Sequence, residues 1–179
     1  MYDITALGEI LVDFTSSGYS SSGMRLFEQN PGGAPANLLV QASRLGMKCA
    51  FIGKAGDDMH GRMLLRTLSK EGIDTQGMIL DNRYPTTLAF VETDENGERS
   101  FSFVRKASAD TMLFPEEVRK DIIKESRIFH FGSLSLTDEP SASAQRELCP
   151  SRRPPAASFP SIRITESLCG TVRTGLYRR

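Results

Sequence analysis

The chain has 179 residues, and its 22 Lys plus Arg balance 22 Asp plus Glu, so no bulk charge attracts it to nucleic acid or anionic membranes. No apolar run approaches the roughly 18 residues of a membrane span, and the N-terminus lacks the residue order of a signal peptide. These features predict a cytoplasmic protein with one domain of α/β size and with no nucleic-acid or membrane partner. The net charge of zero nevertheless combines two parts of the chain with opposite net charges. Residues 1–145 carry 15 basic and 20 acidic side chains, whereas residues 146–179 carry seven Arg, no Lys and two Glu.

The beginning of the chain alternates between strand and helix patterns. Residues 3–12 have apolar side chains at both odd and even positions, as in a central parallel strand covered on both faces. We expect this strand to end at Asp13. A Ser/Gly-rich stretch follows, and then a short run at 24–28 that is typical of an edge strand. The next expected elements are a helix over 34–45, a strand over 48–54 and a helix over 58–71. This alternation predicts βαβ units and a mainly parallel sheet.

The period changes in the middle of the chain. Residues 86–94 and 98–105 flank Glu95-Asn96-Gly97, and Asn-Gly is a strong hairpin signal, so we expect an antiparallel insertion. Residues 115–124 and 127–131 restore the α/β pattern as a helix and a strand. Residues 137–140 resemble the opening of a further helix that does not develop.

Residues 146–179 form an Arg/Pro-rich tail of a different kind. Four Pro and four Ser interrupt any periodicity, which predicts weak order or disorder. Two interpretations stay open at this point: an authentic basic tail, or a shifted reading frame beginning near residue 145.

The cysteines and histidines do not suggest a metal site. Three Cys, at 49, 149 and 169, are odd in number and widely spaced, which fits neither a disulfide framework nor a zinc site. We expect Cys49 to be a buried core thiol, and His60 and His130 to be structural.

Four polar or glycine features point to one pocket. Asp13 follows the first strand, where open α/β sheets bind ligands, and a carboxylate accepts strong hydrogen bonds from neutral hydroxyls. Gly32 and Gly33 allow backbone to approach a ligand, Asn37 offers an acceptor and two donors to a polyol, and Arg105 follows the hairpin and could close over the opening. Each feature alone also has a structural explanation, as a turn, a cap or a surface charge. Their combination favours a binding site.

The motifs GEILVDF at 8–14, PGGAPAN at 31–37 and IGKAGDDMHG at 52–61 together resemble the PfkB (ribokinase-like) carbohydrate kinase family. TLAFV at 87–91, RSF at 99–101 and FVR at 103–105, followed by Ala109-Asp110, are similar to its fructokinase branch. The resemblance extends over residues 1 to about 145. It implies a ribokinase-like three-layer α/β sandwich with a mainly parallel sheet and a small β-lid, whose strands lie near 13–30 and 84–106.

The resemblance also implies a function and a set of site residues. A sugar would be held by Asp13, Gly32, Gly33 and Asn37, with Phe103 and Arg105 contacting it from the lid. ATP with Mg²⁺ would phosphorylate a sugar hydroxyl, most simply converting fructose to fructose 6-phosphate, and the lid would pair two subunits in a homodimer. Ribose, 2-keto-3-deoxygluconate and nucleosides stay open as alternative substrates.

The chain departs from the family in its second part. The catalytic Gly-Ala-Gly-Asp element and the segments that bind adenine and phosphate do not occur in the sequence, so we expect a fold truncated before the nucleotide-binding half, with no catalytic residue, no metal ligand and no activity as written. The Ala55-Gly56-Asp57-Asp58 stretch is a false match, and we interpret Asp58 as a turn and helix cap. Read one frame over, residues 164–170 permit a segment similar to one of the family, which favours the frameshift interpretation. The alternative function is a non-catalytic sugar-binding or dimer-forming fragment.

Overall fold

The computed structural model describes residues 1–93, 96, 98–148, 163–168 and 171–174. Its larger sheet, sheet A, has the strand order β10-β9-β8-β1-β4-β5, and every neighbouring pair is parallel except β9 and β10. The strands are β1 (Tyr2–Leu7), β4 (Cys49–Gly56), β5 (Asp74–Asp81), β8 (Ser126–Gly132), β9 (Arg163–Leu168) and β10 (Thr171–Thr174).

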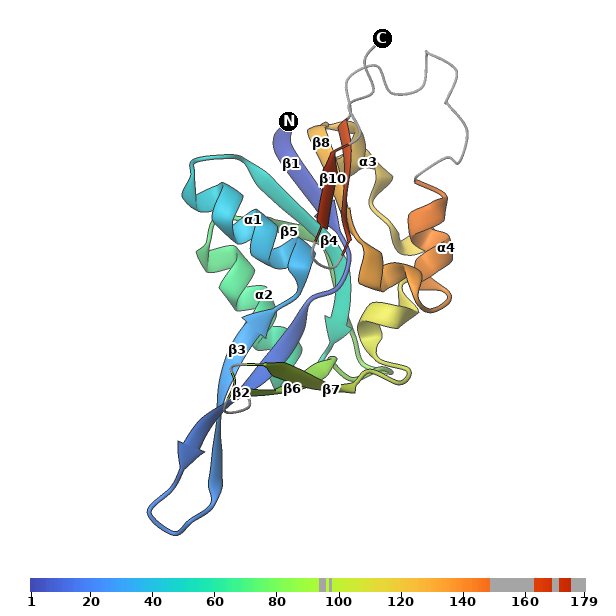
Figure 1. Cartoon of the computed structure of the whole chain (residues 1–179). Helices are drawn as coiled ribbons and strands as arrows, with labels where there is room; N and C mark the ends of the chain where they lie inside the picture. The colour runs from blue at the N-terminus through green and yellow to red at the C-terminus, as the bar shows by residue number, and fades with distance from the viewer. Residues whose placement is uncertain (94–95, 97, 149–162, 169–170, 175–179) are drawn as a thin grey trace.

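Helices cover both faces of sheet A, which makes a three-layer α/β sandwich (Figure 1). The helices α1 (Ala34–Arg44) and α2 (Met59–Lys70) lie on one face, and α3 (Lys120–Lys124) and α4 (Ser141–Arg146) lie on the other (Figure 1). Each interface contains its own apolar cluster, one around Phe51 and Leu64 and the other around Ile52 and Phe129. No helix in the described part of the chain is long and apolar enough to span a bilayer.

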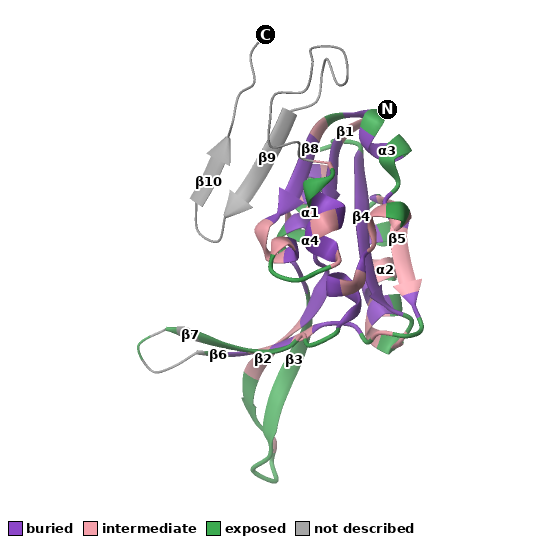
Figure 2. Ribbon diagram, turned by 90° about the vertical axis from the view of Figure 1, so that its right-hand side faces the viewer, coloured by how far each residue is buried: buried purple, intermediate pink, exposed green. Residues whose placement is uncertain are grey.

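Sheet B is smaller and projects from the end of the sandwich (Figure 2). Its order is β3-β2-β6-β7, and β2 pairs in parallel with β6 but antiparallel with β3. The strands are β2 (Leu11–Tyr19), β3 (Arg25–Gly32), β6 (Leu88–Thr93) and β7 (Arg99–Val104). The predicted hairpin is therefore confirmed as the antiparallel pair β6–β7, although residues 94, 95 and 97 of its turn lie outside the described residues.

The prediction of a single first strand over 3–12 is wrong. The strand breaks after Leu7, and the chain re-enters extended structure at Leu11 in the other sheet. Gly8 makes the break possible: its φ is +155°, and a Cβ on it would lie 2.6 Å from Cγ of Pro35. Asp13 accordingly lies within β2 rather than at the carboxyl end of the first strand. The apolar pattern continues through both strands because Leu11 and Val12 are also buried, so hydrophobicity alone did not reveal the break.

Other elements differ in smaller ways. The Ser-rich stretch after Asp13 is the outer part of β2, and the strand β5 was not anticipated. The single helix expected over 115–124 is a 3-10 turn at Pro115–Glu117 followed by α3, and residues 141–146 do form a short helix, α4. For residues 146–179, the predicted weak order stays a prediction. Most of that range, with Cys149 and Cys169, lies outside the described residues, and β9 and β10 are the strands found within it.

Candidate functional site

The junction between the two sheets brings the Asp13 carboxylate against the Gly32 backbone. Asp13 and Gly32 lie on the paired strands β2 and β3, and a Cβ added to Gly32 would come within 2.2 Å of Asp13 Oδ2. Any larger residue at position 32 would therefore displace the carboxylate. The Asp13 side chain is half-buried and receives no hydrogen bond from the described residues, and burial raises the pKa of its carboxyl group. A carboxylate in such a position is available to accept hydrogen bonds from a ligand.

Gly33 continues the junction as the residue before α1. Its φ is +111°, and a Cβ there would lie 2.5 Å from the backbone oxygen of Glu9, so both conformation and space require glycine. Helix α1 then begins at Ala34 with Pro35 in its first turn, as the sequence predicted. Asn37 donates its backbone N–H to the Gly33 oxygen at 2.9 Å, and its side chain is exposed. The structure thus joins Asp13, Gly32 and Gly33 directly and places Asn37 one turn further along.

Phe103 shares a face of sheet B with Asp13. The register pairs Asp13 with Ala89 and Ala89 with Phe103, and residues paired across strands point to the same side of a sheet. Two strand spacings of about 4.8 Å separate Asp13 from Phe103, and the small, buried Ala89 lies between them. Phe103 is 49% exposed and stacks on Phe101 at 6.0 Å between ring centroids. This face therefore presents a carboxylate and two aromatic rings.

Arg105 follows β7, and its guanidinium forms hydrogen bonds with other residues of the chain. Its Nε donates to Asp110 Oδ2 at 2.8 Å, and its terminal nitrogens donate to Thr137 Oγ1 at 2.8 Å, to the Leu134 oxygen at 3.1 Å and to Asp138 Oδ2 at 3.1 Å. The guanidinium thereby ties the end of sheet B to the segment after β8. The predicted contact between Arg105 and a sugar stays a prediction. In this structure its side chain is only 11% exposed.

Glu9 is a buried carboxylate of the junction that the sequence reasoning missed. It is 3% exposed, and its Oε1 accepts the Ala34 N–H at 3.1 Å, which caps α1 in place of the absent Gly33 side chain. Its Oε2 lies 3.5 Å from the Ser135 hydroxyl, and burial raises the pKa of the Glu9 carboxyl group. A carboxylate inside an otherwise apolar run was the available sequence signal.

Asp58 performs the capping role that the sequence predicted. Its Oδ1 accepts N–H groups of His60 at 3.0 Å and Gly61 at 2.8 Å at the start of α2, and its Oδ2 accepts the Thr86 N–H at 2.8 Å. A Cβ at Gly61 would lie 1.9 Å from the Gly56 oxygen, so helix and strand meet here at backbone distance. The motif thus positions the segment entering β6.

The other single-residue expectations concern Cys49 and the histidines. Cys49 is 2% exposed, which confirms a core thiol, and burial raises its pKa to about 11. His60 Nδ1 lies 2.9 Å from Gln29 Nε2, and its ring packs edge-on against Phe14. His130 is 2% exposed within β8. Both histidines therefore belong to packed structure.

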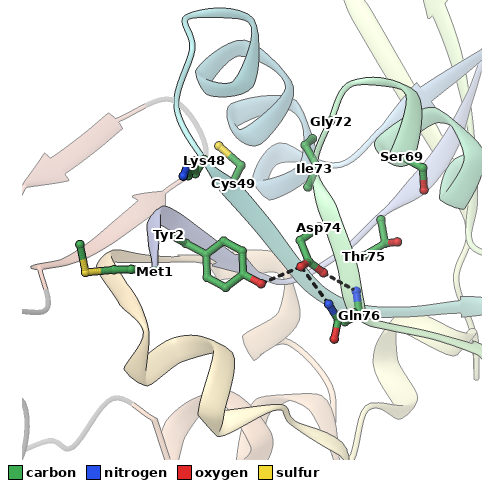
Figure 3. Close-up of a pocket in the computed structure, with 10 residues that line it drawn as sticks. All are labelled: Met1, Tyr2, Lys48, Cys49, Ser69, Gly72, Ile73, Asp74, Thr75 and Gln76. Carbon is green, nitrogen blue, oxygen red and sulfur yellow. Dashed lines mark hydrogen bonds between the residues drawn. The ribbon is translucent and has the colours of Figure 1, made fainter.

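A cleft of about 620 Å³ lies at the opposite end of sheet A, where β1, β4 and β5 begin (Figure 3). Its carboxylate, Asp74, already accepts the Tyr2 hydroxyl at 2.6 Å and the Gln76 N–H at 2.8 Å. The hydrogen bond to Asp74 raises the pKa of Tyr2 to about 12. We place the candidate site at the sheet junction, because this cleft is at the amino ends of the strands and its carboxylate already accepts hydrogen bonds from the protein.

A family model described as "pfkB family carbohydrate kinase" matches residues 1–153. Among curated proteins, "Probable fructokinase-3" of Arabidopsis thaliana is 48% identical over 143 residues, which are 79% of this chain and 41% of that protein. "Fructokinase" of Solanum tuberosum is 46% identical over 143 residues and is covered to 45%. The chain thus spans less than half the length of these relatives.

Solved structures show the same relationship. The fructokinase of Xylella fastidiosa is 38% identical with a TM-score of 0.76, over 81% of this chain and 45% of that one. A sugar kinase of Pyrococcus horikoshii, solved in complex with ATP, is 36% identical with a TM-score of 0.74, over 81% of this chain and 48% of that one. The ribokinase-like α/β fold expected from the sequence is therefore confirmed.

Proposed function

The chain belongs to the pfkB family of carbohydrate kinases, and on that premise we propose that its first 145 residues form the sugar-binding part of an ATP-dependent kinase that converts fructose to fructose 6-phosphate. The observation that carries the proposal is the Asp13 carboxylate, half-buried, without a hydrogen-bond donor from the described residues, and held against the bare backbone of Gly32. A group of this kind recognises neutral hydroxyls, which a sugar supplies in adjacent pairs.

Each residue of the proposed site has a separate part in holding the sugar. Asp13 accepts hydrogen bonds from two hydroxyls, and Gly32 and Gly33 let the ring approach the backbone. Asn37 adds one donor or acceptor from the first turn of α1. Phe103 packs against the C–H face of the ring, and sheet B acts as a lid that excludes water from the transfer. Arg105 uses four of its five guanidinium N–H groups within the molecule, and the remaining N–H, on Nη2, donates to the sugar.

ATP and Mg²⁺ would supply the phosphoryl group and neutralise its charge. The Gly-Ala-Gly-Asp element, which the family resemblance assigns to catalysis, does not occur in this sequence. We therefore assign to this chain the binding and orientation of the sugar, and we expect no turnover from it alone.

Calorimetry with the purified chain tests this assignment. We expect fructose to bind, Asp13→Asn to remove most of the affinity, and a coupled assay for ADP release to show no activity above buffer. A wild-type chain without measurable fructose affinity would overturn the proposed sugar site. ADP release that Asp13→Ala abolishes would instead show that the chain is a complete catalyst.

A second candidate function is a dimer-forming or non-catalytic sugar-binding fragment. The observation that favours it is the exposed aromatic pair on one face of β7, where Phe101 and Phe103 are 54% and 49% exposed. Both outer strands of sheet B, β3 and β7, are edges that a second copy could cover. Light scattering of the wild type and of Phe101→Ser distinguishes the cases: a dimer lost in the variant supports pairing through the lid. The cytoplasmic location expected from the sequence stays a prediction.

A further inference from the structure

Lys54 is a fully buried lysine near the carboxyl end of β4. Its side chain has 0% exposure, and its ammonium donates to Asp81 Oδ2 at 3.1 Å, to the Met112 oxygen at 2.8 Å and to Glu117 at 2.7 Å. The ammonium also lies 5.6 Å from the centroid of the Phe114 ring. Lysine is almost never fully buried unless it is paired, and these contacts use all three of its donors.

The contacts of Lys54 join three parts of the molecule. Asp81 ends β5, whereas Met112 and Glu117 belong to the segment that connects β7 to α3. Asp81 is further held by Arg83, whose hydrogen bonds keep the pKa of Asp81 far below its usual value. An apolar side chain of similar volume would fill the same space without the cost of removing a charge from water. The Lys54 ammonium therefore serves to fix the position of the segment between β7 and α3, through its hydrogen bonds to that segment.

That segment orients Arg105. Asp110 lies two residues before Met112 in the 3-10 turn Ala109–Met112. Its side chain is 1% exposed, its Oδ2 accepts Arg105 Nε at 2.8 Å, and its Oδ1 accepts the Thr87 hydroxyl. A shift of the turn would move the carboxylate that holds the guanidinium. A continuous chain of contacts thus connects Lys54, Met112, Asp110 and Arg105.

We propose that Lys54 is a positioning residue for the sugar site: by holding Met112 and Glu117 it fixes the turn whose Asp110 carboxylate orients Arg105 at the base of sheet B. The part of this inference that concerns sugar affinity rests on the proposed function. The part that concerns the orientation of Arg105 does not.

The first experiment compares Lys54→Met with the wild type in two measurements. NMR of the Arg105 Nε–H measures hydrogen exchange, which we expect to accelerate at least about tenfold when the Asp110 carboxylate is released. Calorimetry measures fructose affinity, which we expect to fall about tenfold in Lys54→Met but less than about twofold when the same change is made in an Arg105→Ala background. Equal losses of affinity in both backgrounds, or unchanged exchange at Arg105, would overturn the proposal.

Control variants separate positioning from general damage. Lys120→Met removes an exposed lysine that pairs only at the surface, with Glu147 at 3.2 Å, and should change neither measurement. If Lys54→Met does not fold, Glu117→Gln weakens the same clamp while keeping its shape, and it should accelerate Arg105 exchange in the same direction. If the wild type has no fructose affinity but Arg105 exchange still accelerates in Lys54→Met, the proposed function is refuted and the positioning role is supported.

Discussion

Sheet A and sheet B are stabilised in different ways, although one chain passes repeatedly between them. Every residue of β4 in sheet A is buried, whereas in β3 of sheet B only the final Gly32 is buried (Figure 2). Sheet A is held by two apolar clusters, one on each face. Sheet B is stabilised by the pairing of its strands, by a few aromatic contacts and by its junction with sheet A. The candidate site lies where the strongly packed region ends, so its residues are free to bind a ligand instead of filling a core.

The largest expected effect is a loss of stability on truncating a core side chain of sheet A, compared with the same truncation in sheet B. Phe51→Ala in β4 should lower the free energy of unfolding by about 3–5 kcal/mol, because Phe51 has 0% exposure and its removal leaves a cavity. Phe101→Ala in β7, where the ring is 54% exposed, should change it by no more than about 0.5 kcal/mol. Urea denaturation followed by circular dichroism measures both. Similar losses in the two variants would show that sheet B contributes to the cooperative core.

Asp13→Asn should have the next largest effect, on binding and not on folding. A hydrogen bond to a charged group contributes about 1.5–3 kcal/mol, so fructose affinity should fall by roughly 10- to 100-fold. Calorimetry gives the affinity, and Asp57→Asn, at a half-exposed site that pairs with Arg62 on the surface, is the matched control. A large loss of stability in Asp13→Asn would indicate that the carboxylate is structural.

The pH dependence of fructose affinity and of stability also tests whether the Asp13 carboxylate serves binding and not folding. Burial raises the pKa of Asp13, so the folded chain binds more protons here than the unfolded chain does. The contribution of Asp13 to stability therefore decreases as the pH rises through the raised pKa, while fructose affinity increases because the carboxylate is the binding form. Titrations of affinity and of unfolding free energy against pH should show these opposite slopes, and Asp13→Asn should flatten both.

Sequence patterns predicted the sandwich well because its elements are locally consistent. Pro35 lies in the first turn of α1, Asp58 caps α2, and the apolar residues Leu64 and Leu68 face the core, so propensity and burial agree. The site was predicted less completely. Its residue types were identified, but the switch from sheet A to sheet B at Gly8 depends on contact with Pro35, which is 27 positions away in the sequence. Glu9 was missed for the same reason, since its partner is the N–H of Ala34.

Asp58→Ala tests the link between the two sheets and should cost about 1–2 kcal/mol, because it removes the cap of α2 and the acceptor for the Thr86 N–H. Burial alone would raise the pKa of Asp58, but the hydrogen bonds from Gly61 and Thr86 outweigh it and the pKa is lowered. This stabilisation should therefore decrease as the pH falls through the lowered pKa. Unfolding measured at several pH values provides the test, and equal effects of Asp58→Ala at all pH values would contradict it.

The smallest expected effect concerns the surface charges of sheet B. Arg25 and Glu92 pair at 2.5 Å across β3 and β6, and their side chains are 42% and 50% exposed. Since solvent and salt screen such a pair, Glu92→Gln should cost less than about 1 kcal/mol, and that cost should disappear in about 1 M salt.

The Lys54 cluster in sheet A has the same kinds of charge but no solvent around the ammonium, so salt should not reduce the effect of Lys54→Met. Unfolding of both variants at low and high salt compares them. A salt-resistant effect at Glu92 would mean that sheet B is packed more like sheet A than its exposure indicates.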